Sequence, residues 1–255
     1  MNIPDTQGIT LLQDSLQESF YNRVKETKNE KLKNERLFAY SLLEQLYKTV
    51  YRDKLPNVTF SESGKPYLKG CSIGISLSHT DSLVLAAISD TGEVGCDAEI
   101  YPDDRREEKL EERFLKDFRM LPRDDTGSDI ILIPFYFDFE SGEVKSYTPE
   151  GENASLDTVF SPGAYFVKAL AHCGKVPIKT DNVHGDGWYL SSVEFGDIYK
   201  FVHKWTCAEA LLKLSGKGFF DYNSLHIVQK QSTTYTFTLD AFGKKYSLSV
   251  AAPRE

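Results

Sequence analysis

The chain has 255 residues, of which 40% are hydrophobic and 27% charged, and its formal net charge is −8 at pH 7. A non-specific nucleic-acid binder is disfavoured by this acidity, although an acidic chain can still hold a local basic pocket for phosphates. No segment is apolar over the length of a membrane span, and the N-terminus lacks the features of a secretory leader. The four cysteines have no C-x-x-C spacing, which indicates reduced thiols. We therefore expect a cytoplasmic protein that binds neither nucleic acid nor membrane.

Two helices are expected in the first 51 residues. The first, residues 9–27, is weakly patterned, whereas residues 34–51 carry apolar side chains at helical spacing behind Asn34 as a possible cap. The lysines between them form either a solvated face or the rim of a site for a phosphate-bearing ligand. Arg36 would lie in the first turn, where a cation gains little from the helix dipole. Either a ligand or an ion pair with a neighbouring glutamate would explain it.

A lysine turn and three short strands follow. Gly64-Lys65-Pro66 predicts a stiff turn that projects the lysine ammonium. Residues 73–78, 83–88 and 94–99 read as strands with tight polar connections, which predicts an antiparallel meander. Ser78 and His79 would stand at the end of the first strand. A histidine there is either structural or merely exposed, or else part of a site that needs a second polar cluster.

Two carboxylates end the third strand. Asp97 and Glu99 are two residues apart, so they would lie on one face of the strand. They would repel each other unless a cation stood between them, and a hard divalent ion with oxygen ligands is the usual solution. The alternative is that both residues simply end a strand in solvent.

The middle of the chain is expected to hold a charged surface helix over residues 103–116 and a hairpin over residues 130–147. Ser161-Pro162 can start a helix that runs to Cys173, and a strand is expected over residues 188–195.

The last part of the chain repeats the pattern of a helix followed by strands. A helix from Trp205 would end at Gly216, with Glu209 and Lys213 at i and i+4 on one face. This pair is either a surface ion pair or part of a site. Strands are expected over residues 223–230, 234–239 and 245–251. The repetition indicates a possible internal duplication, with a site between the two copies.

Four of these segments together resemble the 4'-phosphopantetheinyl transferases of the larger, monomeric Sfp type. That family carries, in order, a GKP turn, an SLSH strand end, a G-x-D-x-E strand and a W-x-x-K-E-x-x-x-K helix. The corresponding segments here are Gly64-Lys65-Pro66, Ser76-Leu77-Ser78-His79, Gly95-Cys96-Asp97-Ala98-Glu99, and Trp205 with Glu209 and Lys213. The resemblance covers about residues 30–118 and 198–251.

The resemblance implies an α/β (α+β) fold of two similar halves related by pseudo-twofold symmetry. Each half would be a helix packed on a small, mainly antiparallel sheet, with coenzyme A in the cleft between them. Residues 1–118 would form the first half, 119–197 an insertion with its own hairpin and helix, and 198–255 the rest of the second half, so that 119–255 together form that half. A monomer would contain the whole site.

The implied reaction transfers the phosphopantetheine group of coenzyme A to a serine of an acyl or peptidyl carrier protein and releases 3',5'-ADP. Asp97, Glu99 and Glu209 would hold Mg²⁺. Lys65, Ser78 and His79 would contact the nucleotide and phosphate groups, Arg36 the nucleotide, and Lys213 the pyrophosphate. Glu209 would also be the base for the incoming serine, directly or through water.

Two departures from the family pattern leave alternatives open. Ala208 replaces the lysine that precedes the helix glutamate, and the stretch from Asp97 to Trp205 is more than twice as long as the family implies. The inserted residues would form a lid, a docking surface or an added subdomain. A catalytically impaired module that binds coenzyme A or a carrier protein is therefore a second interpretation. An acidic interaction protein with no small-molecule site is a third.

Overall fold

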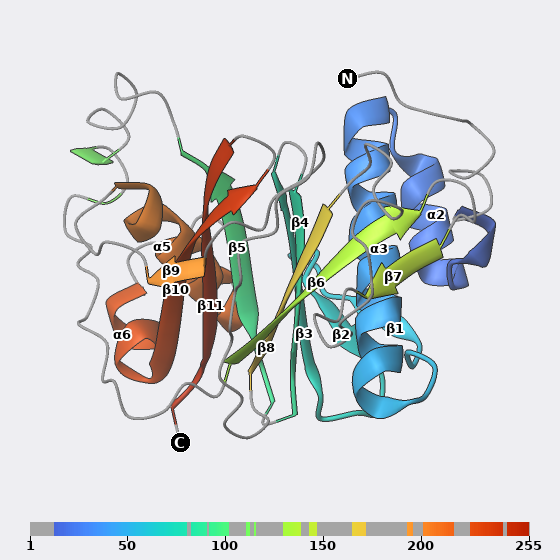
Figure 1. Ribbon diagram of the computed structural model, residues 1–255. Helices are drawn as coiled ribbons and strands as arrows, with labels where there is room; N and C mark the ends of the chain where they lie inside the picture. Colours follow the sequence, from blue (N-terminus) through green and yellow to red (C-terminus); the bar gives the residue numbers. More distant parts are fainter. Residues whose placement is uncertain are drawn as a thin grey trace.

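The described strands form three β-sheets in the computed structural model, and the two larger ones lie face to face between two groups of helices (Figure 1). The structure describes residues 13–80, 83–90, 92–101, 111–112, 115, 130–138, 143–146, 165–171, 193–195, 201–216, 225–241 and 244–254. The helices are α2 (Glu18–Glu26), α3 (Glu30–Tyr51), α5 (Phe201–Ser215) and α6 (Leu225–Lys230). The strands are β1 (Val58–Phe60), β2 (Pro66–Leu68), β3 (Gly74–Thr80), β4 (Leu83–Ser89), β5 (Gly95–Ile100), β6 (Ile130–Asp138), β7 (Glu143–Ser146), β8 (Tyr165–Ala171), β9 (Val193–Phe195), β10 (Ser232–Ala241) and β11 (Lys244–Pro253).

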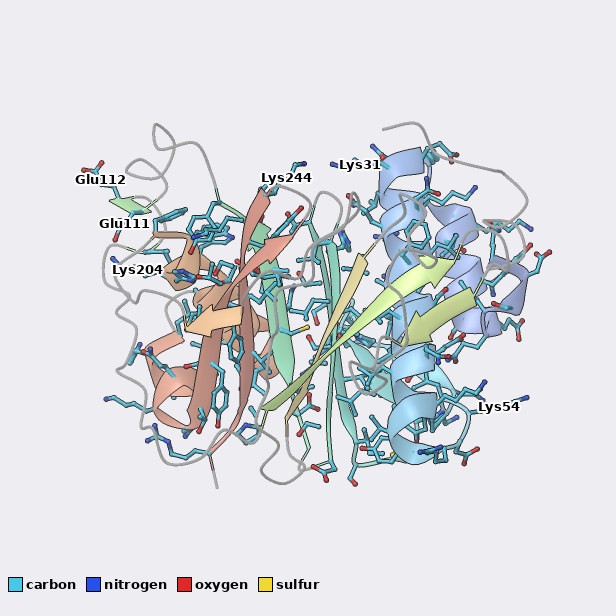
Figure 2. The ribbon with its side chains drawn as sticks, viewed as in Figure 1. Lys31, Lys54, Glu111, Glu112, Lys204 and Lys244 are labelled. Atoms are coloured by element: carbon cyan, nitrogen blue, oxygen red, sulfur yellow. The ribbon has the colours of Figure 1, made fainter. Side chains whose placement is uncertain are left out.

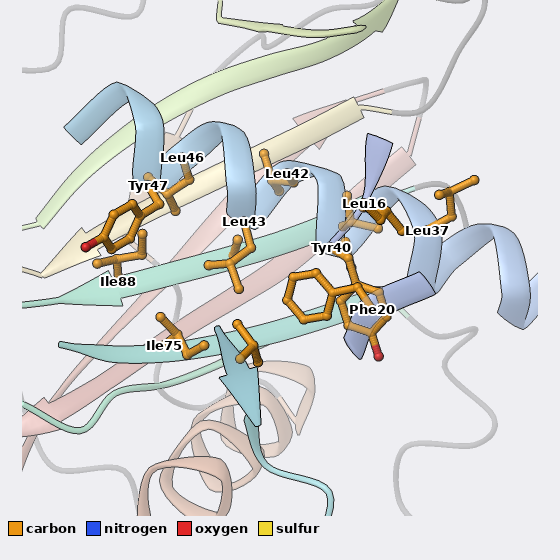
Figure 3. Packing of buried hydrophobic residues seen from close by; sticks show 14 of the residues in the cluster. Leu16, Phe20, Leu37, Tyr40, Leu42, Leu43, Leu46, Tyr47, Ile75 and Ile88 are labelled. Carbon is orange, nitrogen blue, oxygen red and sulfur yellow. The ribbon is translucent and has the colours of Figure 1, made fainter. Parts of the chain in front are cut away.

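Helix α3 packs on the sheet that contains β3 and β4, which we call the first sheet, through an apolar interface (Figure 3). Ala39, Leu43, Leu46 and Val50 follow one another at four-, three- and four-residue spacing, so that one face of the helix meets the side chains of β3 and β4. The buried residues at this interface include Leu37, Leu42, Leu43, Leu46, Ile75, Val84, Ala86 and Ile88.

The start of α3 differs from the prediction. The helix begins at Glu30, and Asn29 caps it by accepting a 3.0 Å hydrogen bond from the backbone N–H of Leu32. The expected cap, Asn34, lies inside the helix instead. The four residues after Asn29 are good helix formers, so the helix starts one turn earlier. Arg36 is consequently in the second turn rather than the first.

The first sheet has the order β3-β4-β8-β6-β7. Strands β3 and β4 are antiparallel, as predicted, and so are β6 and β7, which confirms the expected hairpin. Strand β8 pairs in parallel with β4 and antiparallel with β6. The helix expected over residues 161–173 is therefore wrong for residues 165–171. A short apolar run such as Tyr165–Ala171 fits a buried strand as well as a helix, and its pairing partners decide.

The second sheet has the order β5-β11-β10-β9. The predicted three-strand meander is wrong in its last member, because β5 leaves β4 and pairs antiparallel with β11. In this register Asp97 faces Ser249, and Glu99 faces Ser247. The β10–β11 hairpin confirms the last two expected strands. By contrast, Leu225–Lys230 is a helix rather than a strand, with Leu225 and Val228 turned toward α5 at helical spacing.

Side-chain hydroxyls join the two sheets where β3 runs beside β5. Ser76 Oγ accepts a 3.0 Å hydrogen bond from the backbone N–H of Cys96, and Ser78 Oγ accepts one of 3.2 Å from the N–H of Ala98. These serines therefore satisfy donors on the edge of β5 that β11 does not occupy. On the inner faces, apolar side chains of β4 pack against those of β5, β10 and β11.

Helix α5 covers the outer face of the second sheet. It begins at Phe201, four residues before the predicted start at Trp205, and stops before Gly216, as predicted, with φ of +68° at that glycine. The approach is close at Gly95, where an added Cβ would lie 1.9 Å from the carbonyl oxygen of Ala210. Glycine is therefore required at this position.

Hydroxyl groups form much of the contact between α5 and the sheet. Thr206 Oγ1 lies 2.8 Å from both Ser247 Oγ and Ser249 Oγ. Fully buried His203 contacts Ser247 through Nδ1 at 2.8 Å and the Tyr101 hydroxyl through Nε2 at 2.6 Å. Directional bonds of this kind fix the position of the helix more narrowly than apolar contact does.

The described residues thus form a mixture of helices and small, mainly antiparallel sheets. Within residues 119–197, β6, β7 and β8 extend the first sheet and β9 extends the second. The expected helix over residues 103–116 lies almost wholly outside the described residues, as do residues 188–192 of the expected strand. No described helix has the length and hydropathy needed to cross a membrane.

Candidate functional site

Asp97 is the centre of the candidate site. Asp97 lies on β5 and is only 5% exposed, and its Oδ1 accepts two hydrogen bonds. One comes from Ser78 Oγ on β3 at 2.8 Å, and the other from Lys213 Nζ on α5 at 2.7 Å. Three elements that are distant in the sequence therefore meet at one carboxylate.

Lys213 supplies the positive charge next to this carboxylate. Burial alone would lower its pKa, but the charge of Asp97 and, to a smaller extent, that of Glu209 raise the pKa above its ordinary value. The side chain stays protonated at neutral pH as a result. The Lys213 side chain as a whole is 31% exposed.

Glu99 lies two residues beyond Asp97 and is partly buried. Burial, together with the charge of Asp97, raises the pKa of Glu99 to about 7. The hydroxyl of Thr80 donates a 3.2 Å hydrogen bond to Glu99 Oε2, which opposes this rise. The charge of Asp97 thus acts against ionisation of Glu99, which is the direction that their spacing predicts.

His79 and Arg36 lie on the side of the site nearest α3. His79 Nδ1 is 3.2 Å from Glu35 Oε2. Burial, together with the charges of Lys213 and Arg36, lowers the pKa of His79 to about 4, so the ring is neutral at pH 7. Arg36 donates a 2.7 Å hydrogen bond to Thr27 Oγ1. Lys31, exposed at the start of α3, adds to the positive charge (Figure 2).

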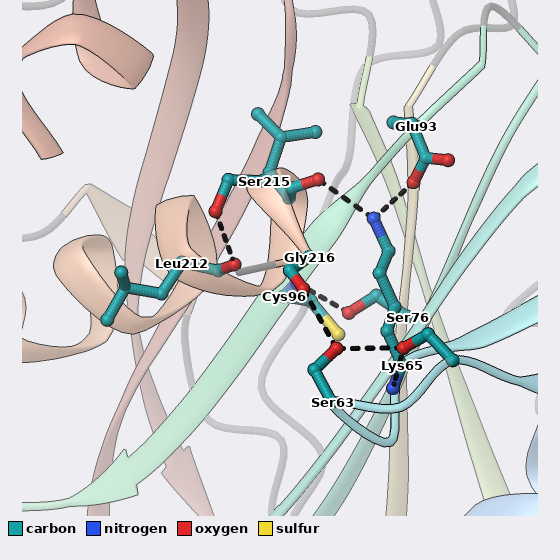
Figure 4. A network of polar contacts seen from close by, with 10 residues as sticks. Ser63, Lys65, Ser76, Glu93, Cys96, Leu212, Ser215 and Gly216 are labelled. Atoms are coloured by element: carbon teal, nitrogen blue, oxygen red, sulfur yellow. Dashed lines mark hydrogen bonds and ion pairs between the residues drawn. The ribbon is translucent and has the colours of Figure 1, made fainter. Parts of the chain in front are cut away.

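Lys65 lies in its own set of contacts. Its ammonium donates a 2.8 Å hydrogen bond to the carbonyl oxygen of Leu214, near the end of α5, and forms an ion pair with Glu93 (Figure 4). The predicted turn at Gly64 is present, with φ of +85°. Thus Lys65 reaches the helix that carries Lys213, through the last turn of that helix.

The donor set around Asp97 fits a divalent cation in part. Asp97 Oδ2 is buried, and no described residue hydrogen-bonds it. Such an oxygen, next to a second carboxylate with a raised pKa, is a suitable ligand for Mg²⁺. Glu209 is buried on α5 and close enough to influence Lys213. However, the described residues include no group of three His, Cys, Asp or Glu side chains that could hold a metal ion. The fit thus rests on Asp97 and Glu99.

Sequence reasoning missed two contributors to this cluster. Thr80 hydrogen-bonds Glu99, and Glu35 contacts His79. The alternation of β3 contained a signal for Thr80, because it lies on the same strand face as Ser78. Glu35 was recognisable only as a neighbour of Arg36, since its contact with His79 depends on how α3 packs on β3.

Ala208, the residue that departs from the family motif, is fully buried in an apolar cluster beneath α5. A lysine at this position would have to bury its charge or displace the helix.

Comparisons of the chain with models of protein families and with characterised proteins find no match.

Proposed function

We propose that this protein transfers the 4'-phosphopantetheine group of coenzyme A to a serine of an acyl or peptidyl carrier protein, with Mg²⁺ as cofactor. The observation that carries the proposal is the meeting of Ser78, Asp97 and Lys213 at one buried carboxylate. These residues come from three of the four segments that resemble the family, and nothing in their sequence separation requires them to meet.

The charges of the cluster suit a substrate with phosphate groups. Lys213 is protonated and partly exposed, so it can bind the pyrophosphate and stabilise charge that develops there. Neutral His79 can exchange hydrogen bonds with the nucleotide, and Arg36 adds a cation beside it. Glu209 would take the proton of the attacking serine hydroxyl, directly or through water.

Asp97 and Glu99 would hold Mg²⁺, with Glu209 as the third ligand that the family resemblance implies. The ion, when bound, neutralises phosphate charge and makes the phosphorus easier to attack. Asp97 contributes its free Oδ2 without breaking its contact with Ser78. The nearby carboxylate of Glu99 would lose the repulsion that now raises its pKa.

The proposal includes the arrangement of the chain as two similar halves related by pseudo-twofold symmetry. Helix α3 on β3 and β4 would be the core of one half, and α5 on β11 and β10 that of the other, with β5, from the first 118 residues, added to the sheet of the second half. The cluster around Asp97 lies where β3 meets β5, which is where a cleft between two such halves would open. The residues that β3 and β5 contribute to the cluster come from one chain, which supports a monomer.

The test is transfer of phosphopantetheine to an apo carrier protein by Asp97→Asn and Glu209→Gln variants. We expect both to retain the fold, by circular dichroism, and to lose at least about 100-fold in rate, since each removes a charged group from the reaction centre. Glu30→Gln is the matched control, because this exposed carboxylate lies at the start of α3, and it should keep full activity. Normal turnover by either site variant would contradict the proposal.

A second candidate function is binding of coenzyme A or a carrier protein without transfer. The contact between Lys213 and Asp97 favours it, because the ammonium already neutralises the carboxylate that a metal would otherwise neutralise. Calorimetric titration separates the two functions. Binding of coenzyme A without modification of any carrier would favour the second, whereas Mg²⁺-dependent modification would exclude it.

A further inference from the structure

A turn in the first part of the chain closes on the end of α5 (Figure 4). Ser63 Oγ donates a 2.8 Å hydrogen bond to the carbonyl oxygen of Gly216. Lys65 Nζ donates one of the same length to the carbonyl oxygen of Leu214. We call the turn from Ser61 to Lys65, with these two contacts, the clasp.

The clasp is stiff within itself. The backbone N–H of Ser61 donates to the carbonyl of Lys65 at 2.9 Å, and that of Gly64 donates back to Ser61 at 2.9 Å. Ser61 Oγ also accepts a 3.0 Å hydrogen bond from the N–H of Lys65 and contacts Ser63 Oγ at 2.8 Å. Because of these bonds the two groups that reach α5 have little freedom to move independently.

The partners of the clasp are groups that a helix cannot satisfy alone. The last carbonyl oxygens of a helix have no N–H partner within it, and a cation at this end interacts favourably with the helix dipole. Lys65 brings both a donor and a positive charge, and Ser63 brings a second donor. The approach is tight, since a Cβ at Gly216 would lie 3.4 Å from Lys65 Cδ.

The helix turn that the clasp closes carries Lys213. Between Lys213 and Gly216 lies less than one full turn of helix, so fraying at Gly216 would release Lys213 as well. On the other side, Gly95 packs against the backbone of Ala210 and Leu214, which leaves the helix no room to settle closer. Among the residues that the structure describes, the clasp thus adds a second set of contacts to this turn.

We propose that Ser63 and Lys65 are positioning residues, which hold the last turn of α5 so that the Lys213 ammonium stays against Asp97. This inference rests on the proposed function for its effect on catalysis, but not for its effect on the helix. It gives Lys65 a role that does not require contact with a ligand, and gives Ser63 the same role.

The alternative role of Lys65, as a direct contact to phosphate, makes a different prediction about Ser63. A contact with phosphate depends on the charge of Lys65. Loss of the Ser63 hydroxyl would therefore leave that contact unchanged. A positioning role depends on both donors. The ammonium is also already shared between Leu214 and Glu93, and only 15% of the Lys65 side chain is exposed. The pair of residues therefore distinguishes the two roles.

The experiment compares Ser63→Ala, Lys65→Met and the exposed neighbour Glu62→Gln as the control, all in the full chain. Hydrogen exchange of the amides from Lys213 to Gly216 is measured without ligand. We expect about three- to tenfold faster exchange in both clasp variants, which is the effect of losing one hydrogen bond at a helix end. We expect no change in Glu62→Gln. Unchanged exchange in both clasp variants would overturn the proposal.

Kinetics then separate positioning from ligand contact. Both clasp variants should lower kcat for phosphopantetheine transfer, with less than about twofold change in the KM for coenzyme A. A raised KM in Lys65→Met with no effect of Ser63→Ala would assign Lys65 to the ligand and overturn the positioning role. If the unaltered protein modifies no carrier, the proposed function fails, while the exchange data still decide whether the clasp holds α5.

Discussion

The two helix–sheet interfaces of this protein differ in the proportion of apolar and hydrogen-bonded contacts. Helix α3 lies on β3 and β4 through leucine, isoleucine and valine side chains. Helix α5 also buries apolar side chains, but its contact with the sheet adds hydroxyls, a buried histidine and the Asp97–Lys213 pair. The free energy of apolar burial is roughly proportional to the area buried, so small shifts of the helix change it little. A hydrogen-bonded network, by contrast, satisfies all its donors and acceptors in only one arrangement. The candidate site lies against the interface that tolerates least movement.

The largest effect should come from the apolar interface and leave the site intact. Leu43 is fully buried beneath α3, so Leu43→Ala should lower the free energy of unfolding by about 2–5 kcal/mol through lost burial and a residual cavity. Denaturant titration measures this. The ion pair of Lys213 should persist in the folded variant, and a simultaneous loss of that pair would contradict the separation of the two interfaces.

Lys213→Met should have the next largest effect. It leaves Asp97 buried with its hydroxyl partner but without its cation, which should cost about 1–3 kcal/mol in unfolding free energy. Adding Asp97→Asn should recover part of the loss, because the unpaired charge is then gone, and a double-mutant cycle measures the coupling. Lys31→Met is the control, since its 69% exposed side chain should contribute about 0.5 kcal/mol or less. Equal costs for both lysines would remove the case for a special pair.

Thr206→Val tests the hydroxyl contacts beneath α5. The substitution keeps the shape of the side chain but removes an oxygen that contacts Ser247 and Ser249, so it should cost about 1–3 kcal/mol. Ser41→Ala is the matched change on α3, where the hydroxyl donates only to a carbonyl of its own helix at 2.9 Å. That change should be close to neutral. Similar costs for the two variants would show that the interfaces do not differ in this respect.

The smallest effect concerns pH. The pKa of His79 falls from 6.5 to about 4 in the folded protein, so the unfolded chain binds more protons between these values. The stability that neutral His79 contributes is complete above pH 6.5 and is lost as the pH falls toward 4. Lys213, Arg36 and Lys31 favour the neutral ring, whereas Asp97 and the contact with Glu35 oppose it.

His79→Gln should therefore lose less stability than the unaltered protein between pH 7 and pH 4.5. We expect a difference of about 1 kcal/mol or less, because 32% of the side chain is exposed and solvent screens its interactions. Denaturant titrations at the two pH values measure it. An identical fall in stability for both proteins would mean that the histidine is not held neutral.

The sequence predicted elements whose signals are local. Short runs bounded by tight polar connections predicted β3 and β4, the last two expected strands correspond to the β10–β11 hairpin, and Gly216 predicted where α5 stops. It did not predict which strand β5 pairs with, since β11 lies more than 140 residues away and nothing in β5 itself selects it. For the same reason, the strand Tyr165–Ala171 was predicted as a helix and the helix Leu225–Lys230 as a strand. Short apolar segments take the form that their packing neighbours impose.

The candidate site divides in the same way. The repulsion of Asp97 and Glu99 followed from their spacing on one strand, and the raised pKa of Glu99 agrees with it. The contact between Lys213 and Asp97 joins residues 116 positions apart and depends on how closely α5 approaches Gly95. The contact of Lys65 with the end of α5 likewise depends on tertiary packing, and no local pattern announces it.

The most direct test of the proposed function is the intact mass of an apo acyl carrier protein after incubation with this protein, coenzyme A and Mg²⁺. We predict a gain equal to one phosphopantetheine group, which is absent when EDTA removes the metal. A carrier that keeps its original mass, together with no binding of coenzyme A by calorimetry, would contradict the account.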